Sequence, residues 1–412
     1  MGKFINEVET MEAWQRLLNY VKINTQSDEN SETMPSTACQ QELAKRLEEE
    51  MRALGLERVR REESGYVYGF LPASEGFAHS PCIGLIAHID TAPDFCGNNV
   101  QPRVVENYDG GPIDLGHGRV LSPEQFPDLK EQLGHDLIVT DGSTLLGADD
   151  KAGIAEILTA CERLIREKIP HCALALCFCP DEEIGHGAAL LDIPGFGADF
   201  AYTLDGDAVN ELNYETFNAS AALWEIQGVN VHPGSARDIM VNACLVAMEI
   251  NALLPPEEIP ARTEGYEGFF HLTDMSGSCE RAELKYIIRD HDEARYRERQ
   301  QRMRQIEEEI NVRYGKGTAK LTITEQYRNM ACVLKDKMEI VRRAERAMEK
   351  AGLKADIRPV RGGTDGAQLS CRGLPCPNLG TGGFGFHGPY EHISVQDMEK
   401  AVEIIMNLAT EK

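Results

Sequence analysis

Apolar residues follow two alternating patterns along this chain: short continuous runs, and longer stretches with helical spacing. The runs "CIGLIA", "ALALCF" and "FAYTL" are continuously apolar, which predicts strands buried on both faces. Between the first two, "KAGIAEILTACERLIRE" places Ile154, Ile157, Leu158 and Cys161 on one helical face. Strands that alternate with amphipathic helices predict an α/β fold with a mostly parallel sheet.

The pattern changes near residue 218, after which "AALWEIQGV" opens a strand-helix-strand-strand-helix-strand series that ends with "AKLTITEQY". This order is the split βαβ arrangement of a small ferredoxin-like α+β domain. Helical spacing returns in "KDKMEIVRRAERAMEKAGL" and "VQDMEKAVEIIMNLA". We therefore expect a discontinuous main domain, residues 1–217 and 328–412, with an inserted domain at 218–327.

Acidic residues and histidines stand at the ends of several predicted elements of the main domain. His88 and Asp90, Glu182 and Glu183, and Asp205 follow predicted strands, Asp149 starts the helix after "TLLGA", and His387 follows the Gly-rich "LGTGGFGF". In open α/β sheets, sites form beyond the carboxyl ends of the strands. Histidine nitrogen and carboxylate oxygen are zinc ligands, and a two-metal site needs a bridging carboxylate and a free base. The adjacent glutamates in "CPDEEIGHGA" fit one ligand and one base.

Each residue of this set has a plainer interpretation when it is taken alone. His88 can simply be hydrogen-bonded to Asp90, and Asp149 or Asp150 can cap a helix. Glu182 and Glu183 can occupy a solvated turn. Five separate segments that deliver such residues to one sheet edge nevertheless favour the metal site.

Eight segments carry a resemblance across nearly the whole chain. "LIAHIDTAPDFCGNNVQP", "TLLGADDKAGIAEI", "PDEEIGHGA", "YTLDGD", "GVNVHPGSA", "TEGYEGFFHL", "RGGTDGAQLS" and "FGFHGPYEH" resemble the peptidase T family of tripeptide aminopeptidases. That family lies within the two-zinc hydrolases that include aminoacylases and glutamate carboxypeptidases. The resemblance implies a catalytic main domain, an inserted lid and dimerisation domain, and release of the N-terminal residue of a tripeptide by a metal-activated water.

The resemblance also assigns the metal ligands. It implies that His88 and Asp205 bind one zinc ion and that Glu183 and His387 bind the other. Asp149 would bridge the two. Cobalt or manganese would fit similar ligands.

Further roles are implied for residues around the metals. Glu182 would be the general base, and Asp90 would orient His88 from behind. His232 in "VNVHPGS" resembles a histidine that the inserted domain sends to the partner subunit's scissile carbonyl, which implies a homodimer. Arg289 and Arg361 are candidates for binding a substrate carboxylate, although "HPGS" also suits a plain turn and surface arginines usually pair with acids.

Two other functions share these features. A carboxypeptidase or an N-acyl-amino-acid deacylase would use the same ligands and differ in how it grips the substrate ends. A non-catalytic dimeric protein that binds metal or peptide would not need Glu182. "GFGFHG" matches a dinucleotide motif in letters, but Pro389 follows it where a helix would be needed.

The net charge limits the classes of binding partner, and the cysteine pattern indicates the cellular compartment. A formal net charge of -25 argues against nucleic acid or an anionic membrane as a partner. The twelve cysteines show no C-x-x-C pair, which suits reduced thiols. Because "MGKFINEVET" lacks an apolar signal core, we expect a cytoplasmic protein that acts on small peptides.

Overall fold

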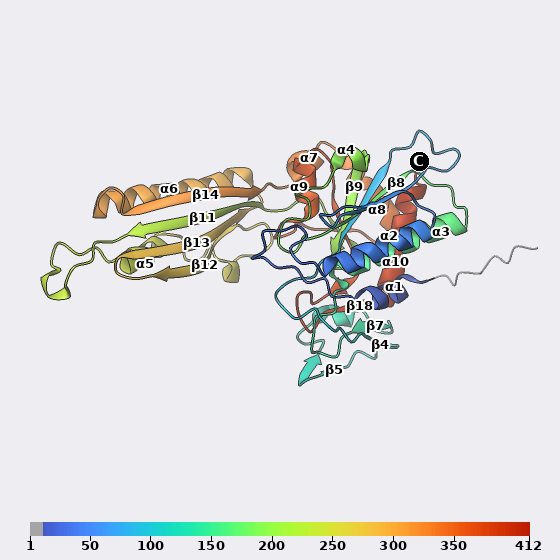
Figure 1. Cartoon of the computed structure of the whole chain (residues 1–412), viewed down its shortest axis with the longest axis horizontal. Helices are drawn as coiled ribbons and strands as arrows, with labels where there is room; N and C mark the ends of the chain where they lie inside the picture. The colour runs from blue at the N-terminus through green and yellow to red at the C-terminus, as the bar shows by residue number, and fades with distance from the viewer. Residues whose placement is uncertain (1–10) are drawn as a thin grey trace, which may run out of the picture. The chain divides into compact units, whose positions relative to one another are not determined.

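The computed structural model describes residues 11–412, which form two units (Figure 1). The first unit runs from residue 11 to Tyr214 and includes Val333–Arg358 and Thr364–Lys412. The second comprises Glu215–Cys332 and Pro359–Gly363. The segment 1–10, whose lack of an apolar signal core supports the expected cytoplasmic location, lies outside the described residues.

The first unit is built on a mixed sheet whose described strands run in the order β1-β2-β8-β3-β9-β16-β10-β15. Their bounds are β1 Glu57–Arg61, β2 Val67–Leu71, β3 Ile83–His88, β8 Leu174–Cys179, β9 Phe200–Gly206, β10 Glu211–Asn213, β15 Asp356–Ile357 and β16 Asn378–Gly380. Strand β3 pairs in parallel with β8 and β9, and β9 pairs in parallel with β16. The predicted, mostly parallel sheet is confirmed at the centre, and the carboxyl ends of β3, β8 and β9 share one edge.

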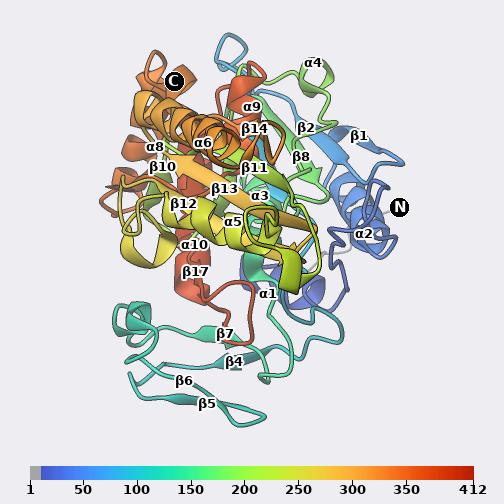
Figure 2. The ribbon, with the colours of Figure 1, turned by 90° about the vertical axis from the view of Figure 1, so that its left-hand side faces the viewer.

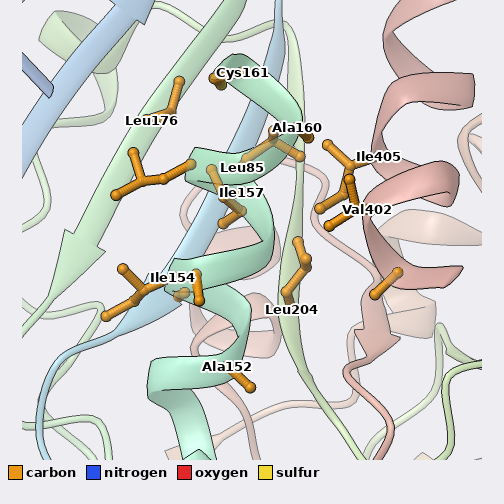
Figure 3. Close-up of a cluster of buried hydrophobic side chains, with 14 of the residues drawn as sticks. Leu85, Ala152, Ile154, Ile157, Ala160, Cys161, Leu176, Leu204, Val402 and Ile405 are labelled. Carbon is orange, nitrogen blue, oxygen red and sulfur yellow. The ribbon is translucent and has the colours of Figure 1, made fainter. Parts of the chain in front are cut away.

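Helix α3 (Ala148–Arg166) covers this central sheet because its apolar face is wide and continuous. Figure 3 shows Ile154 and Ile157 of α3 in the same apolar cluster as Leu85 of β3, with Val402 on the neighbouring helix α10. The remaining helices of the first unit are α1 Ala13–Tyr20, α2 Gln40–Ala53, α4 Ile193–Phe196, α8 Met338–Lys350, α9 Asp365–Cys371 and α10 Val395–Thr410. None of the helices in the described part of the chain is long and apolar enough to cross a membrane.

A smaller sheet in the same unit was not predicted. It joins β17, β18, β7 and β4 in that order, next to the β5-β6 hairpin (Figure 2). The bounds are β4 Arg103–Val105, β5 Ile113–Gly116, β6 Arg119–Leu121, β7 Leu137–Val139, β17 Gly383–Phe384 and β18 His392–Ser394. Strands of two to four residues are too short to show an alternating pattern.

The second unit has the predicted split βαβ order. Its described sheet runs β12-β13-β11-β14, with bounds β11 Asn218–Gln227, β12 Phe269–Gly277, β13 Arg281–Asp290 and β14 Ala319–Tyr327. Helices α5 (Ala243–Ala252) and α6 (Glu293–Tyr314) pack on it around Trp224 and Tyr296. Helix α5 begins after Asn242, whose side chain caps it by accepting the N–H groups of Cys244 and Leu245. The short helix α7 (Ala331–Leu334) follows β14.

Candidate metal centre

The first ligand position lies at the end of β3. His88 is the last residue of that strand and is 2% exposed. Its Nδ1 lies 3.1 Å from the carbonyl oxygen of Asp90 and 3.4 Å from the Asp90 carboxylate. The other ring nitrogen, Nε2, therefore faces the sheet edge. The carboxylate of Asp90 also accepts the backbone N–H groups of Glu182 at 2.9 Å and Glu183 at 3.3 Å, so it ties the end of β3 to the acidic loop.

Asp149 lies between two groups of possible ligands. Its Oδ1 is 2.9 Å from Nε2 of His88, which is 3.5 Å from Asp205. Its Oδ2 is 3.3 Å from Nε2 of His387, which is 3.0 Å from Glu183. The two carboxylate oxygens of Asp149 thus face different histidines, as a bridging ligand requires.

These groups have the donor chemistry and spacing of a metal site. The ligand atoms of His88, Asp149 and Asp205, and those of Asp149, Glu183 and His387, lie within 4.8 Å of one another in each group. Two donors about 2.05 Å from one tetrahedral zinc ion are roughly 3.3 Å apart, which is close to the distances above. In addition, Oε1 of Glu183 is buried without a hydrogen-bond partner. The residues present therefore fit a pair of divalent cations.

The electrostatics of the centre also favour added positive charge. Burial, followed by repulsion from Asp149, raises the pKa of Glu183 to about 7. Burial raises the pKa of Asp205 to about 6, with Asp149 contributing. Asp149 and Glu183 raise the pKa of His387 to about 11. Crowded carboxylates that resist ionisation, next to histidines held protonated, indicate a surplus of negative charge that cations would relieve.

Glu182 belongs to neither ligand group. It follows β8 in the same loop as Glu183, but its carboxyl is surrounded differently. Burial, then the charges of Asp205 and Asp365, raise its pKa well above the usual value. A partly buried carboxyl whose pKa is influenced by the ligand carboxylates, but which lies outside both groups, is suited to proton transfer.

The acidic loop is anchored by its first residue. Asp181 is fully buried and accepts the backbone N–H of Ser36 at 2.6 Å, its hydroxyl at 2.5 Å and Nε2 of Gln40 at 2.6 Å. Its φ of +57° turns the chain sharply after β8. The three consecutive acids therefore have different surroundings, and of the three only Glu183 belongs to a ligand group.

Helix α3 begins with an irregular turn rather than a simple cap. Asp149 and Asp150 have non-helical backbone angles within its first turn. Asp150 accepts the N–H of Gly153 at 3.3 Å, as a cap would, and the N–H of His88 at 3.1 Å. Asp150 therefore caps the helix, as one of the two predicted alternatives, and the Asp149 carboxylate is free to face the ligand groups.

Two buried acids near the centre were missed by the sequence analysis. Both carboxylate oxygens of Asp365 are buried without a hydrogen-bond partner, and burial raises its pKa to about 7. Glu391 is 1% exposed and accepts backbone N–H groups next to Asp149. Neither acid follows a long apolar run, so the strand-end rule could not find them; Asp365 stands in the "RGGTDG" motif and Glu391 four residues after His387.

The remaining predicted residues lie in the second unit. His232 is exposed, and its Nδ1 accepts the N–H of Gly234. Arg289 donates to carbonyl oxygens of Ser220 and Ile288. Arg361 donates to the second unit's own 263–267 loop. In this conformation both arginines therefore have partners within their own unit.

A hollow of about 410 Å³ adjoins the ligand groups. It is lined by Glu29, Pro93, Asp94, Glu183 and Ile184. One Asp94 oxygen lies 3.8 Å from Nδ1 of His387. The hollow beside Glu183 is thus lined by three carboxylate side chains.

Comparisons with known proteins agree with this geometry. The family model described as peptidase family M20/M25/M40 matches residues 137–411. Peptidase T of Clostridium perfringens is 52% identical over 395 residues, which cover 96% of this chain and 97% of the relative. The solved aminopeptidase PepT of Bacillus cereus has a TM-score of 0.76 at 24% identity, over 96% of this chain and 98% of that one. A tripeptidase of Staphylococcus aureus has a TM-score of 0.77 at 22% identity, over 97% and 98%. The chain belongs to peptidase family M20/M25/M40, alongside peptidases T.

Proposed function

We propose that this protein is a metal-dependent aminopeptidase that releases the N-terminal residue of tripeptides. The observation that carries the proposal is the position of Asp149, whose two oxygens face separate ligand groups while Glu182 remains outside both. The peptidase T relatives support a peptide substrate. The acidic hollow beside Glu183 supports a substrate with a free amine, because an ammonium group is attracted to carboxylates.

The proposed reaction needs two bound divalent cations, and five residues would hold them. Two divalent cations, when bound, lower the pKa of water and polarise a carbonyl oxygen. His88, Asp149 and Asp205 would hold one of them, and Glu183 and His387 would complete the site of the other. Zinc suits this mixture of nitrogen and oxygen donors, and cobalt or manganese are possible substitutes.

Proton transfer falls to Glu182. It would accept a proton from the attacking water and later donate it to the departing amine. Asp90 would hold the His88 ring through Nδ1 and the acidic loop through two N–H groups, which fixes ligand and base together.

The second unit would act as a lid and as the surface for homodimerisation. Its outer strands β12 and β14 each have only one neighbour in the sheet, and α5 exposes Leu245 and Met248. His232 would stabilise the developing oxyanion in the partner subunit's site. Arg289 and Arg361 would bind the substrate carboxylate only after exchanging their present carbonyl partners.

A cytoplasmic location is consistent with cysteines that are present as free thiols. All twelve cysteines of the sequence lie in the described part of the chain, and none of them forms a disulfide there. Reduced cysteines are usual in reducing compartments.

Product analysis tests the proposed function directly. The zinc-loaded protein is incubated with an unblocked tripeptide of three different residues, and the products are identified by mass spectrometry. An N-terminal amino acid and a dipeptide are expected, and the N-acetylated tripeptide should not be cleaved. Release of the C-terminal residue, or hydrolysis of an acylated amino acid alone, would contradict the aminopeptidase and indicate a related hydrolase.

A further inference from the structure

Glu391 is a buried carboxylate that contacts the loop carrying Asp149. Its Oε2 accepts the backbone N–H groups of Leu146 at 2.6 Å and Gly147 at 2.7 Å. Its Oε1 accepts the N–H of Asp149 at 3.0 Å. Glu391 is 1% exposed, so these three hydrogen bonds belong to the protein interior and not to its surface.

The contact joins two ligand segments that are distant in sequence. Glu391 follows His387 by four residues, whereas its three donors belong to the turn that enters α3. Gly147 adopts a φ of +79° in that turn, and because glycine is the most flexible residue, hydrogen bonds from outside the turn help to hold its backbone in one position. The carboxylate thus links the loop of His387 to the loop of Asp149.

We propose that Glu391 is a positioning residue that sets the spacing between Asp149 and His387 and thereby the affinity of the second ligand group for its cation. The inference rests on the proposed two-metal function. A ligand group binds tightly only if its donors are held at the required separation before the ion arrives, and outer contacts commonly provide that restraint. The 3.3 Å between Oδ2 of Asp149 and Nε2 of His387 is the separation in question.

The chemistry of the contact requires a carboxylate. An ionised carboxylate only accepts hydrogen bonds, so both oxygens can serve N–H donors. In Glu391→Gln, one oxygen is replaced by an NH₂ group, which would face a backbone N–H. The substitution therefore keeps the volume of the side chain and breaks at least one of the three bonds.

The experiment compares Glu391→Gln with wild-type protein in two measurements. Hydrogen exchange of the metal-free protein reports the protection of the amides of Leu146, Gly147 and Asp149. Calorimetric titration with Zn²⁺ then reports two binding steps. We expect faster exchange at these amides, and one binding step weakened about tenfold or more, as for other outer contacts of metal ligands.

Asp136→Asn is the matched control. Asp136, next to β7, accepts the backbone N–H of Asn107 at 2.8 Å, and within the described part of the chain its side chain has no hydrogen bond to a ligand loop. This variant should leave both zinc steps and the three amides unchanged. Glu391→Asp, which keeps the charge on a shorter side chain, should restore part of the affinity and keeps the test available if the glutamine variant does not fold.

Two results would overturn the proposal: wild-type affinity in both steps for Glu391→Gln, or equal weakening by the Asp136 control. The proposed function fails separately. If the wild-type protein binds no pair of zinc ions, the two-metal function is wrong, and the exchange measurement still reports whether Glu391 holds the Asp149 turn.

Discussion

Glu182 and Glu183 are neighbours in the sequence, yet their carboxyl groups have different surroundings. Glu183 lies 3.0 Å from His387 and has a buried oxygen without a partner, as an intended metal ligand would. Glu182 stands outside both ligand groups. The same substitution at each position should therefore affect different steps.

Glu182→Gln should reduce kcat by about 10²- to 10⁴-fold, because a general base of this kind contributes that much. Its metal content should stay at the wild-type value, since no ligand is changed. Steady-state kinetics with a tripeptide and elemental analysis by mass spectrometry measure the two quantities. Glu183→Gln is the matched control, which should lose both activity and part of the bound metal. Wild-type kcat in Glu182→Gln would refute the assigned base.

Asp149→Ala should weaken both metal sites, whereas His88→Ala should weaken mainly one. The reason is that Asp149 is the residue that occurs in both ligand groups of the described structure. Stepwise zinc titration followed by calorimetry distinguishes the two variants. One site of wild-type affinity in Asp149→Ala would show that the carboxylate does not bridge.

Glu156 provides a test of charge burial away from the centre. Both of its oxygens are buried without partners, and burial raises its pKa well above the usual value. The folded state thus favours the protonated form of Glu156. The stability that this protonated side chain contributes is fully present below the unfolded pKa of about 4.3, and it is lost as the pH rises toward the folded pKa. In Glu156→Gln the side chain cannot ionise, so this pH-dependent loss of stability does not occur.

The gain in melting temperature of Glu156→Gln over wild type should therefore be small at pH 5 and larger at pH 8. Calorimetry of both proteins at each pH measures that difference, in which effects common to the two proteins cancel. Glu167→Gln, at the exposed end of the same helix, is the matched control. A difference that shrinks as the pH rises would contradict the sign of the argument.

At the scale of elements, the loop after β8 shows why one short segment can carry two site residues. Asp181 fixes its start through Ser36 and Gln40, and Asp90 fixes its middle through two N–H groups. The loop is held from two separate elements before any cation binds.

Asp181→Asn should lower the free energy of unfolding by about 2 kcal/mol, because hydrogen bonds to a buried charged group are lost and an amide N–H would face the Ser36 N–H. It should also lower kcat, since Glu182 follows directly. Urea unfolding and kinetics measure both. Asp192→Asn, which alters an exposed helix cap in the same chain segment, is the matched control. Unchanged stability in Asp181→Asn would contradict the anchoring role.

The sequence allowed the elements with strong periodicity to be predicted, and the site as far as those elements determine it. Strands β3, β8 and β9 and helix α3 have continuous apolar faces, so His88, Glu183 and Asp205 could be placed at one edge. The short strands β4 to β7 carry too few residues to show a period. Glu391 and Asp365 could not be recognised, because their surroundings form only when distant segments meet.

For the whole molecule, the two units have separate cores. Trp224, Tyr296 and Ile306 belong to the core of the second unit, whereas Leu85 and Ile157 belong to that of the first. A unit with its own core can change its outer surface without disturbing the other. Assembly and metal binding can therefore be tested independently.

The double variant Leu245→Glu and Met248→Glu should convert the proposed homodimer into a monomer. These side chains are 62% and 59% exposed on α5, and two carboxylates there would oppose an apolar contact with a second copy. Size-exclusion chromatography with light scattering measures the mass. Zinc content should remain unchanged, and kcat should fall because His232 is proposed to act across subunits. Leu190→Glu, in the first unit, should stay dimeric; a fully active monomer would refute the role of His232.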